Sequence, residues 1–104
     1  MSLETFFAQY LPHRLEEAFE QFPSNVVFAF FLGEDDWQLE RSGKAINVGP
    51  VTEVPKDCEF HCSMQVFEAI IKGDLNPTRA FLDGRLRLQG DLGLALQLQK
   101  VLAA

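Results

Sequence analysis

The feature that most constrains the fold is an uninterrupted apolar run at residues 26–32, Val-Val-Phe-Ala-Phe-Phe-Leu. A strand that is apolar on both faces is typical of the centre of a sheet. One row of the run is Val26, Phe28, Phe30 and Leu32, and the other is Val27, Ala29 and Phe31. We expect Phe28 and Phe30 to line the interior, although the pattern leaves the choice of row open. The outward row then needs cover from a helix, a second subunit or another partner.

Four further segments alternate apolar and polar residues, which indicates strands with one buried face. We expect these strands at 37–41, 45–48, 58–62 and 85–89, with turns at 33–36 and 42–44. Their apolar rows include Trp37, Phe60 and Leu86, whereas their opposite rows are mostly polar. The pattern therefore predicts a sheet with one solvated face and one face covered by helices.

Helical spacing of apolar residues surrounds these strands. It predicts helices at 3–11 and 12–21 with a bend at Pro12, a helix between Ser63 and Gly73, a short helix at 77–82, and a last helix at 92–102. Phe6, Phe7, Phe67 and Phe81 are among the residues expected to cover the sheet. The order of elements predicts an α+β fold, with helices on one face of a five-stranded, mainly antiparallel sheet in a single domain at 1–104.

The charge and hydropathy of the chain argue against nucleic acid and membranes as partners. The chain of 104 residues has a formal net charge of −6, whereas a nucleic-acid footprint is basic. An acidic membrane repels such a chain on average, although a local basic patch is compatible with this charge. The longest apolar run is far shorter than a membrane span, so we expect no stable membrane insertion. Residues 1–5 lack the basic stretch of a targeting signal, and we expect a cytoplasmic protein.

The residue types that carry chemistry do not converge. Asp57, Cys58, Glu59, His61 and Cys62 are the best candidates for a metal site. Strand alternation places the histidine opposite both cysteines, whereas zinc needs four converging ligands. In a strand the cysteines lie roughly 13 Å apart, too far for a disulfide. A nucleophilic site would pair a cysteine with His13 or His61, but the pattern places no carboxylate to orient the histidine. The acidic turn at 34–36 is more typical of solvated charges than of a cation site. We expect no catalytic residues, no metal and no cofactor.

The segment at 73–98 resembles the sterol carrier protein family. The resemblance lies in Gly-Asp-Leu-Asn-Pro at 73–77, in Ala-Phe-Leu-Asp-Gly-Arg-Leu-Arg-Leu-Gln-Gly-Asp at 80–91, and in Leu-Ala-Leu-Gln-Leu at 94–98. It implies an apolar tunnel between sheet and helices, and ligands such as fatty acids, fatty acyl-CoA, isoprenoids or sterols, without catalysis. The chain looks like a compact, stand-alone, bacterial-like member. Its last residues, 101–104, lack a peroxisomal signal, which argues against a peroxisomal carrier and against sterol as the default ligand.

Two functions follow from the resemblance. The first is a lipid-binding module that acts as a carrier or substrate presenter, and the alternative is an interaction or dimerisation domain with a vestigial cavity. The expected ligand-binding residues are Phe28, Phe30, Trp37, Phe60, Phe67, Phe81, Leu86, Leu94 and Leu98. A polar mouth near Arg79, or near Asn76 and Thr78, would hold a carboxylate or phosphate. An open apolar cavity favours the first function, whereas an interior filled by phenylalanines in a stable dimer favours the second.

Overall fold

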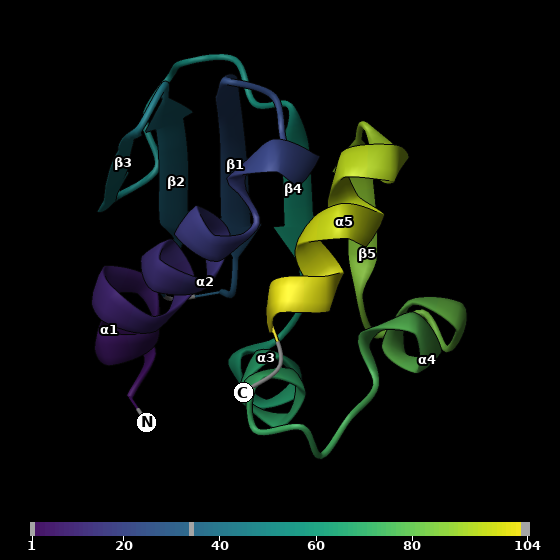
Figure 1. Cartoon of the computed structure of the whole chain (residues 1–104). Helices are drawn as coiled ribbons and strands as arrows, with labels where there is room; N and C mark the ends of the chain where they lie inside the picture. The colour runs from purple at the N-terminus through teal and green to yellow at the C-terminus, as the bar shows by residue number, and fades with distance from the viewer. Residues whose placement is uncertain (1, 34, 103–104) are drawn as a thin grey trace.

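The apolar run forms the central strand of a five-stranded sheet (Figure 1). The computed structural model describes residues 2–33 and 35–102; Glu34 of the predicted acidic turn and the end of the chain at 103–104 lie outside them. The strands are β1 (Asn25–Phe31), β2 (Trp37–Ser42), β3 (Ala45–Gly49), β4 (Cys58–His61) and β5 (Arg87–Gly90), in the order β3-β2-β1-β4-β5. Only the β1–β4 pair in this described sheet is parallel. The predicted α+β class is confirmed.

The N-terminal helical segment is continuous where a bend at Pro12 was predicted. It consists of α1 (Leu3–Thr5), the π-helical η1 (Phe6–Tyr10) and α2 (Leu11–Glu17), followed by the 3-10 turn η2 (Phe19–Gln21). Tyr10 and Leu11, which flank the junction, both keep helical dihedral angles. Proline cannot donate a hydrogen bond to the carbonyl four residues back, and its ring presses on that carbonyl in a regular helix. The wider π turns before Pro12 accommodate this misfit without a break.

Three further helices lie where the sequence predicts them. They are α3 (Met64–Ile71), α4 (Pro77–Leu82) and α5 (Leu92–Leu102). The Ser63 hydroxyl accepts a hydrogen bond from the Val66 amide at 3.1 Å. The Asn76 side-chain oxygen accepts from the amides of Thr78 and Arg79 at 2.8 and 3.3 Å. Such caps satisfy the free N–H groups of a first helical turn, which explains why both helices begin where they do.

The helices lie on one side of the sheet, with α1, α2 and α5 in front of it in Figure 1. The row of β1 that faces them contains Phe28 and Phe30, both with no exposed surface. In α4 the inward position belongs to Ala80, which is buried, and not to Phe81, whose side chain is 40% exposed. The prediction that Phe81 covers the sheet is therefore wrong, because the short helix turns its smallest side chain inward.

The outer face of the sheet is partly covered by the chain itself. The connection from β3 to β4 crosses from one edge of the sheet to the far side of β1 (Figure 1). Its Thr52 bonds the Gln38 side chain, and Asp57 bonds the Val27 backbone at both N–H and C=O. Gln38, which the connection contacts, is buried, and so is Ala29 opposite it on β1. The predicted solvated face is thus covered in part at Gln38 of β2.

Candidate functional site

Aromatic rings fill the space between η1, α3 and the inner face of the sheet. Phe7 stands at their centre: its ring stacks on Trp37 at a centroid distance of 4.7 Å and on Phe67 at 5.6 Å. The Phe7 ring also lies 5.1 Å from that of Phe30, which in turn stacks on Phe60 at 5.1 Å. Aromatic pairs at these distances attract each other beyond the area they bury. Five elements, namely η1, β1, β2, β4 and α3, therefore meet in one aromatic cluster.

The cluster contains four of the residues predicted to bind a ligand, namely Phe30, Trp37, Phe60 and Phe67. Phe28 lies to one side, with its ring 6.1 Å from that of Phe22. Sequence reasoning placed Phe6 and Phe7 on a covering helix but left both out of the predicted site. Both side chains are fully buried, and their place on the apolar face of the first helix was the signal that could have included them.

On the side of α5 the interior is lined by leucines, and next to them lies the side-chain amide of Gln99. Leu98 and Leu86 are fully buried or nearly so, and Leu94 is half-buried against the same core. Gln99 is only 6% exposed, and its Nε2 has no hydrogen-bond partner among the described residues. A buried amide without a hydrogen-bond partner lowers the stability of a folded protein by about 1–3 kcal/mol. Gln99 is therefore a candidate for a functional role.

Sequence reasoning missed Gln99. Its spacing was the available signal, because it lies four residues after the buried Ala95 and three before the buried Leu102. A glutamine at an inward helical position is more informative than an apolar residue there, since polar side chains rarely lie inside without a partner. Two further buried polar atoms lack a partner within the described part of the chain, namely Gln97 Oε1 and Trp37 Nε1.

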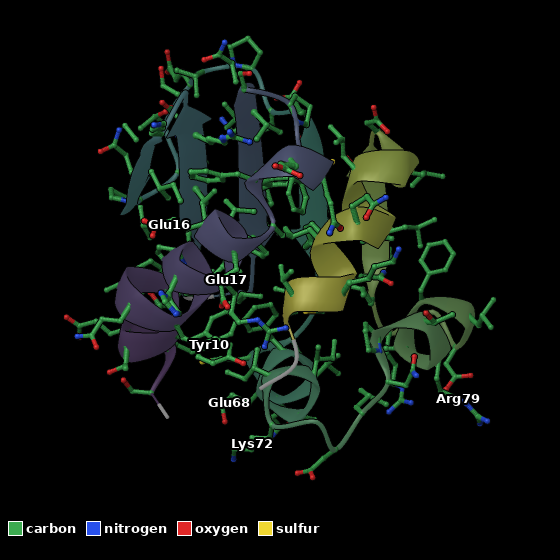
Figure 2. All side chains as sticks on the ribbon, in the orientation of Figure 1. Tyr10, Glu16, Glu17, Glu68, Lys72 and Arg79 are labelled. Carbon is green, nitrogen blue, oxygen red and sulfur yellow. The ribbon has the colours of Figure 1, made fainter. Side chains whose placement is uncertain are left out.

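A pocket of about 530 Å³ opens between α4 and α5, within the size range of small-molecule sites. Asn76, Pro77, Thr78, Leu96, Gln97, Gln99 and Lys100 line it. The pocket thus joins the predicted polar residues near the start of α4 to the buried glutamine of α5. Arg79 instead lines a neighbouring depression with Leu82, and its side chain points away from the body of the protein (Figure 2).

Both cysteine thiols are protonated at neutral pH, which makes them poor nucleophiles. Both are free thiols, and burial raises the pKa of each to about 11; the nearby Asp91 and Asp57 charges contribute at Cys58. The protonated Cys58 Sγ donates to the Asp91 carbonyl oxygen at 3.0 Å. His61 lies 2.9 Å from Glu59, on the opposite side of β4 from Cys58. Across residues 2–33 and 35–102, no group of three His, Cys, Asp or Glu side chains could hold a metal ion.

The amino-acid sequence is similar to a known protein family and to characterised proteins. The model of the SCP-2 sterol transfer family matches residues 7–103. Human sterol carrier protein 2 is 33% identical over 97 residues, which cover 85% of this chain but only 18% of that relative. No helix within the described residues is long and apolar enough to cross a membrane.

Solved structures share the fold. The solution structure of palmitated SCP2L2 from Aedes aegypti has a TM-score of 0.71 at 23% identity, covering 100% of this chain and 96% of that one. A double mutant of the sec-alkyl sulfatase PisA1 has a TM-score of 0.80 at 15% identity, covering 100% of this chain and 17% of that one. The family match extends over nearly the whole length of the sequence, and this chain therefore belongs to the SCP-2 sterol transfer family.

Proposed function

We propose that this chain binds one lipid without transforming it, as a carrier or as a domain that presents the lipid to an enzyme. The apolar chain of the lipid lies in the interior between the helices and the sheet, and its polar end lies in the pocket between α4 and α5. The observation that carries the proposal is Gln99, which belongs both to the buried face of α5 and to the lining of that pocket. An unpartnered amide at this junction is suited to a carboxyl or carbonyl group.

The aromatic cluster is compatible with a guest. Phenylalanine rings form no hydrogen bonds, so an apolar chain that displaces them leaves no polar group unpaired. Each methylene that leaves water stabilises the complex by about 0.8 kcal/mol, and eight of them by roughly 6 kcal/mol before the costs of association. The Aedes aegypti relative in its palmitated form supports a fatty acyl chain as the ligand class. We assign Phe30, Trp37, Phe60, Phe67, Leu86, Leu94 and Leu98 to the lipid chain, with Phe28 at its margin.

Native mass spectrometry of the purified chain, followed by organic extraction, tests the proposal. We expect a mass increment that corresponds to one lipid per chain, and the same stoichiometry after addition of a fatty acid to delipidated protein. A chain that carries no lipid and ignores added fatty acids, acyl-CoA and isoprenoids would show that the proposal is wrong.

Replacement of Gln99 separates a ligand contact from a structural role. We expect Gln99→Leu to weaken binding of a fluorescent fatty acid about fivefold, because one hydrogen bond of about 1 kcal/mol is lost. Thermal stability should stay level or rise, because the unpartnered buried amide is removed with it. Gln65→Leu, at an exposed position of α3, is the matched control and should change neither quantity. Unchanged affinity in a folded Gln99→Leu chain contradicts the assignment.

The alternative is an interaction or dimerisation domain whose interior is closed. It is favoured by the contact distances between the rings, which leave the aromatic cluster filled by its own side chains. The same mass spectrum distinguishes the two functions. A stable dimer without lipid, before and after incubation with fatty acid, supports the alternative.

A further inference from the structure

A second pocket lies on the face of the sheet that the helices leave open, which is turned away from the viewer in Figure 1. Its volume is about 370 Å³, within the range of sites for small molecules. The residues that line it are Phe31, Gly33, Asp36, His61, Cys62, Gly84, Arg85 and Arg87. They share no member with the lining of the pocket between α4 and α5. The proposed function therefore leaves this pocket without a role.

The strand register places an aromatic ring, an imidazole and a guanidinium in one row of this pocket. Phe31 lies opposite His61 in the parallel β1–β4 pair, and His61 lies opposite Arg87 in the β4–β5 pair. The rings of Phe31 and His61 stack at a centroid distance of 4.7 Å, with 11° between their planes. Because β1 and β4 are parallel and end at these residues, the pocket adjoins the carboxyl ends of two neighbouring parallel strands. Ligands often bind at that position in sheets with parallel strands.

The charges of the lining favour an anion. Two arginines and one aspartate line the pocket, whereas the whole chain has a net charge of −6. The aspartate is Asp36, whose Oδ1 already accepts a hydrogen bond from the Leu32 amide at 2.9 Å. Arg85 contacts Asp83 through Nη2 alone, at 3.0 Å. Arg87 has neither an ion pair nor a side-chain hydrogen bond within residues 2–33 and 35–102, so its guanidinium is available to a ligand.

The imidazole of His61 is held in place beside these arginines. Its Nε2 lies 2.9 Å from Glu59 Oε1, and its ring is stacked on Phe31. Glu59 is thereby engaged by the histidine. The planar fork of a guanidinium matches the oxygen atoms of a phosphate or a carboxylate, which it binds through two parallel hydrogen bonds. A phosphate presents three terminal oxygens, enough to accept from two guanidinium groups at once.

We infer that this pocket binds a small organic anion through a phosphate or carboxylate group, which Arg87 and Arg85 hold. The organic part of the ligand lies beside the stacked rings of Phe31 and His61. The sheet separates this anion from the proposed lipid, because Phe30 and Phe60 occupy the opposite faces of the same two strands. The inference therefore adds a second ligand and does not depend on the first.

An NMR titration of the isotope-labelled chain with phenyl phosphate, at constant ionic strength, tests the inference. We expect saturable shifts of the backbone amides of Gly33, Gly84 and Arg87, and little change at Gln99 in the other pocket. Benzoate should bind at the same residues but more weakly, because a carboxylate has fewer acceptor oxygens and less charge. Phenol has the same ring without an anion and should cause no saturable shift.

Three substitutions of cations resolve what the arginines contribute. Arg87→Gln should raise the dissociation constant for phenyl phosphate about tenfold or more, because charge-assisted hydrogen bonds are lost. Arg87→Lys keeps the charge without the fork and should raise it about threefold. Arg85→Gln should also raise it about threefold, since Asp83 already holds one nitrogen of Arg85. Lys44→Gln is the matched control, at an exposed position of the β2–β3 turn, and should change it little.

Unchanged affinity in a folded Arg87→Gln chain overturns the inference, and so do shifts that phenol produces equally. Shifts that centre on Lys100 or Arg79 overturn it as well, because they place the anion on another surface. Uptake of a fluorescent fatty acid separates this inference from the proposed function, and we expect Arg87→Gln to retain that uptake. Absence of uptake by the unchanged chain contradicts the proposed function and leaves the anion site standing.

Discussion

Phe7→Ala is expected to lower the free energy of unfolding by about 3–5 kcal/mol, the range for deletion of a buried aromatic side chain. The reason is its position: the Phe7 ring contacts those of Phe6, Phe30, Trp37 and Phe67, and no surface of Phe7 is exposed. Its removal leaves a cavity that rigid neighbours fill only in part. Of the mutations considered, this one should have the largest effect on stability.

Denaturant unfolding followed by tryptophan fluorescence measures this effect, because Trp37 is the only tryptophan and stacks on Phe7 at 4.7 Å. Leu92→Ala is the control: its side chain is 50% exposed, and we expect a change within about 0.5 kcal/mol. We also expect Phe7→Ala to take up a fluorescent fatty acid at least as well as the unchanged chain, because the missing ring occupies space proposed for the lipid. A loss below about 1 kcal/mol would contradict the described packing.

Gly90→Ala is expected to cost about 2–4 kcal/mol, because it combines backbone strain with a steric clash. Gly90 has a φ of +92°, a region that side chains other than glycine rarely adopt. A Cβ atom at this position would overlap the carbonyl oxygen of Asp57, which accepts the amide of Asp91 at 2.8 Å. The clash falls where β5 ends beside β4, so the variant should loosen the edge of the sheet.

Gly84→Ala separates the two causes. Gly84 has a φ of +79°, but a Cβ atom there meets nothing within 4 Å. We expect Gly84→Ala to cost about 1–2 kcal/mol from the backbone alone. Thermal unfolding of both variants measures the difference. Equal losses at the two glycines would show that the neighbouring Asp57 backbone moves aside without cost.

Local patterns were sufficient for most of the fold. Alternation and cap residues located all five strands and the helices α3, α4 and α5 to within two residues, because hydrophobic period and helix capping are local properties. The central place of β1 followed from its two apolar faces. Part of the aromatic cluster could also be predicted from the sequence, because the inward row of a strand points toward the covering helices wherever those helices lie.

The remaining features depend on distant neighbours. Whether Pro12 breaks a helix depends on the geometry of the turn before it, which no residue pattern reveals. The orientation of the six-residue helix α4 on the sheet determines that Ala80 is buried and Phe81 is not. The cover over Gln38 comes from a connection whose path depends on the strand order. Gln99 was visible in the sequence, but its importance appears only when no described group is found to pair with it.

The parallel pairing of β1 with β4 divides the chain into two halves that meet along one seam. On one side, β1, β2 and β3 are joined by short links and form a meander from neighbouring residues. On the other side, Phe28 lies opposite Cys58, thirty residues further along the chain. Pairing between such distant segments must first overcome the entropy of closing a long loop, whereas hairpins close quickly. We therefore expect the meander to form early and to serve as the template on which the C-terminal half, with its pocket, assembles afterwards.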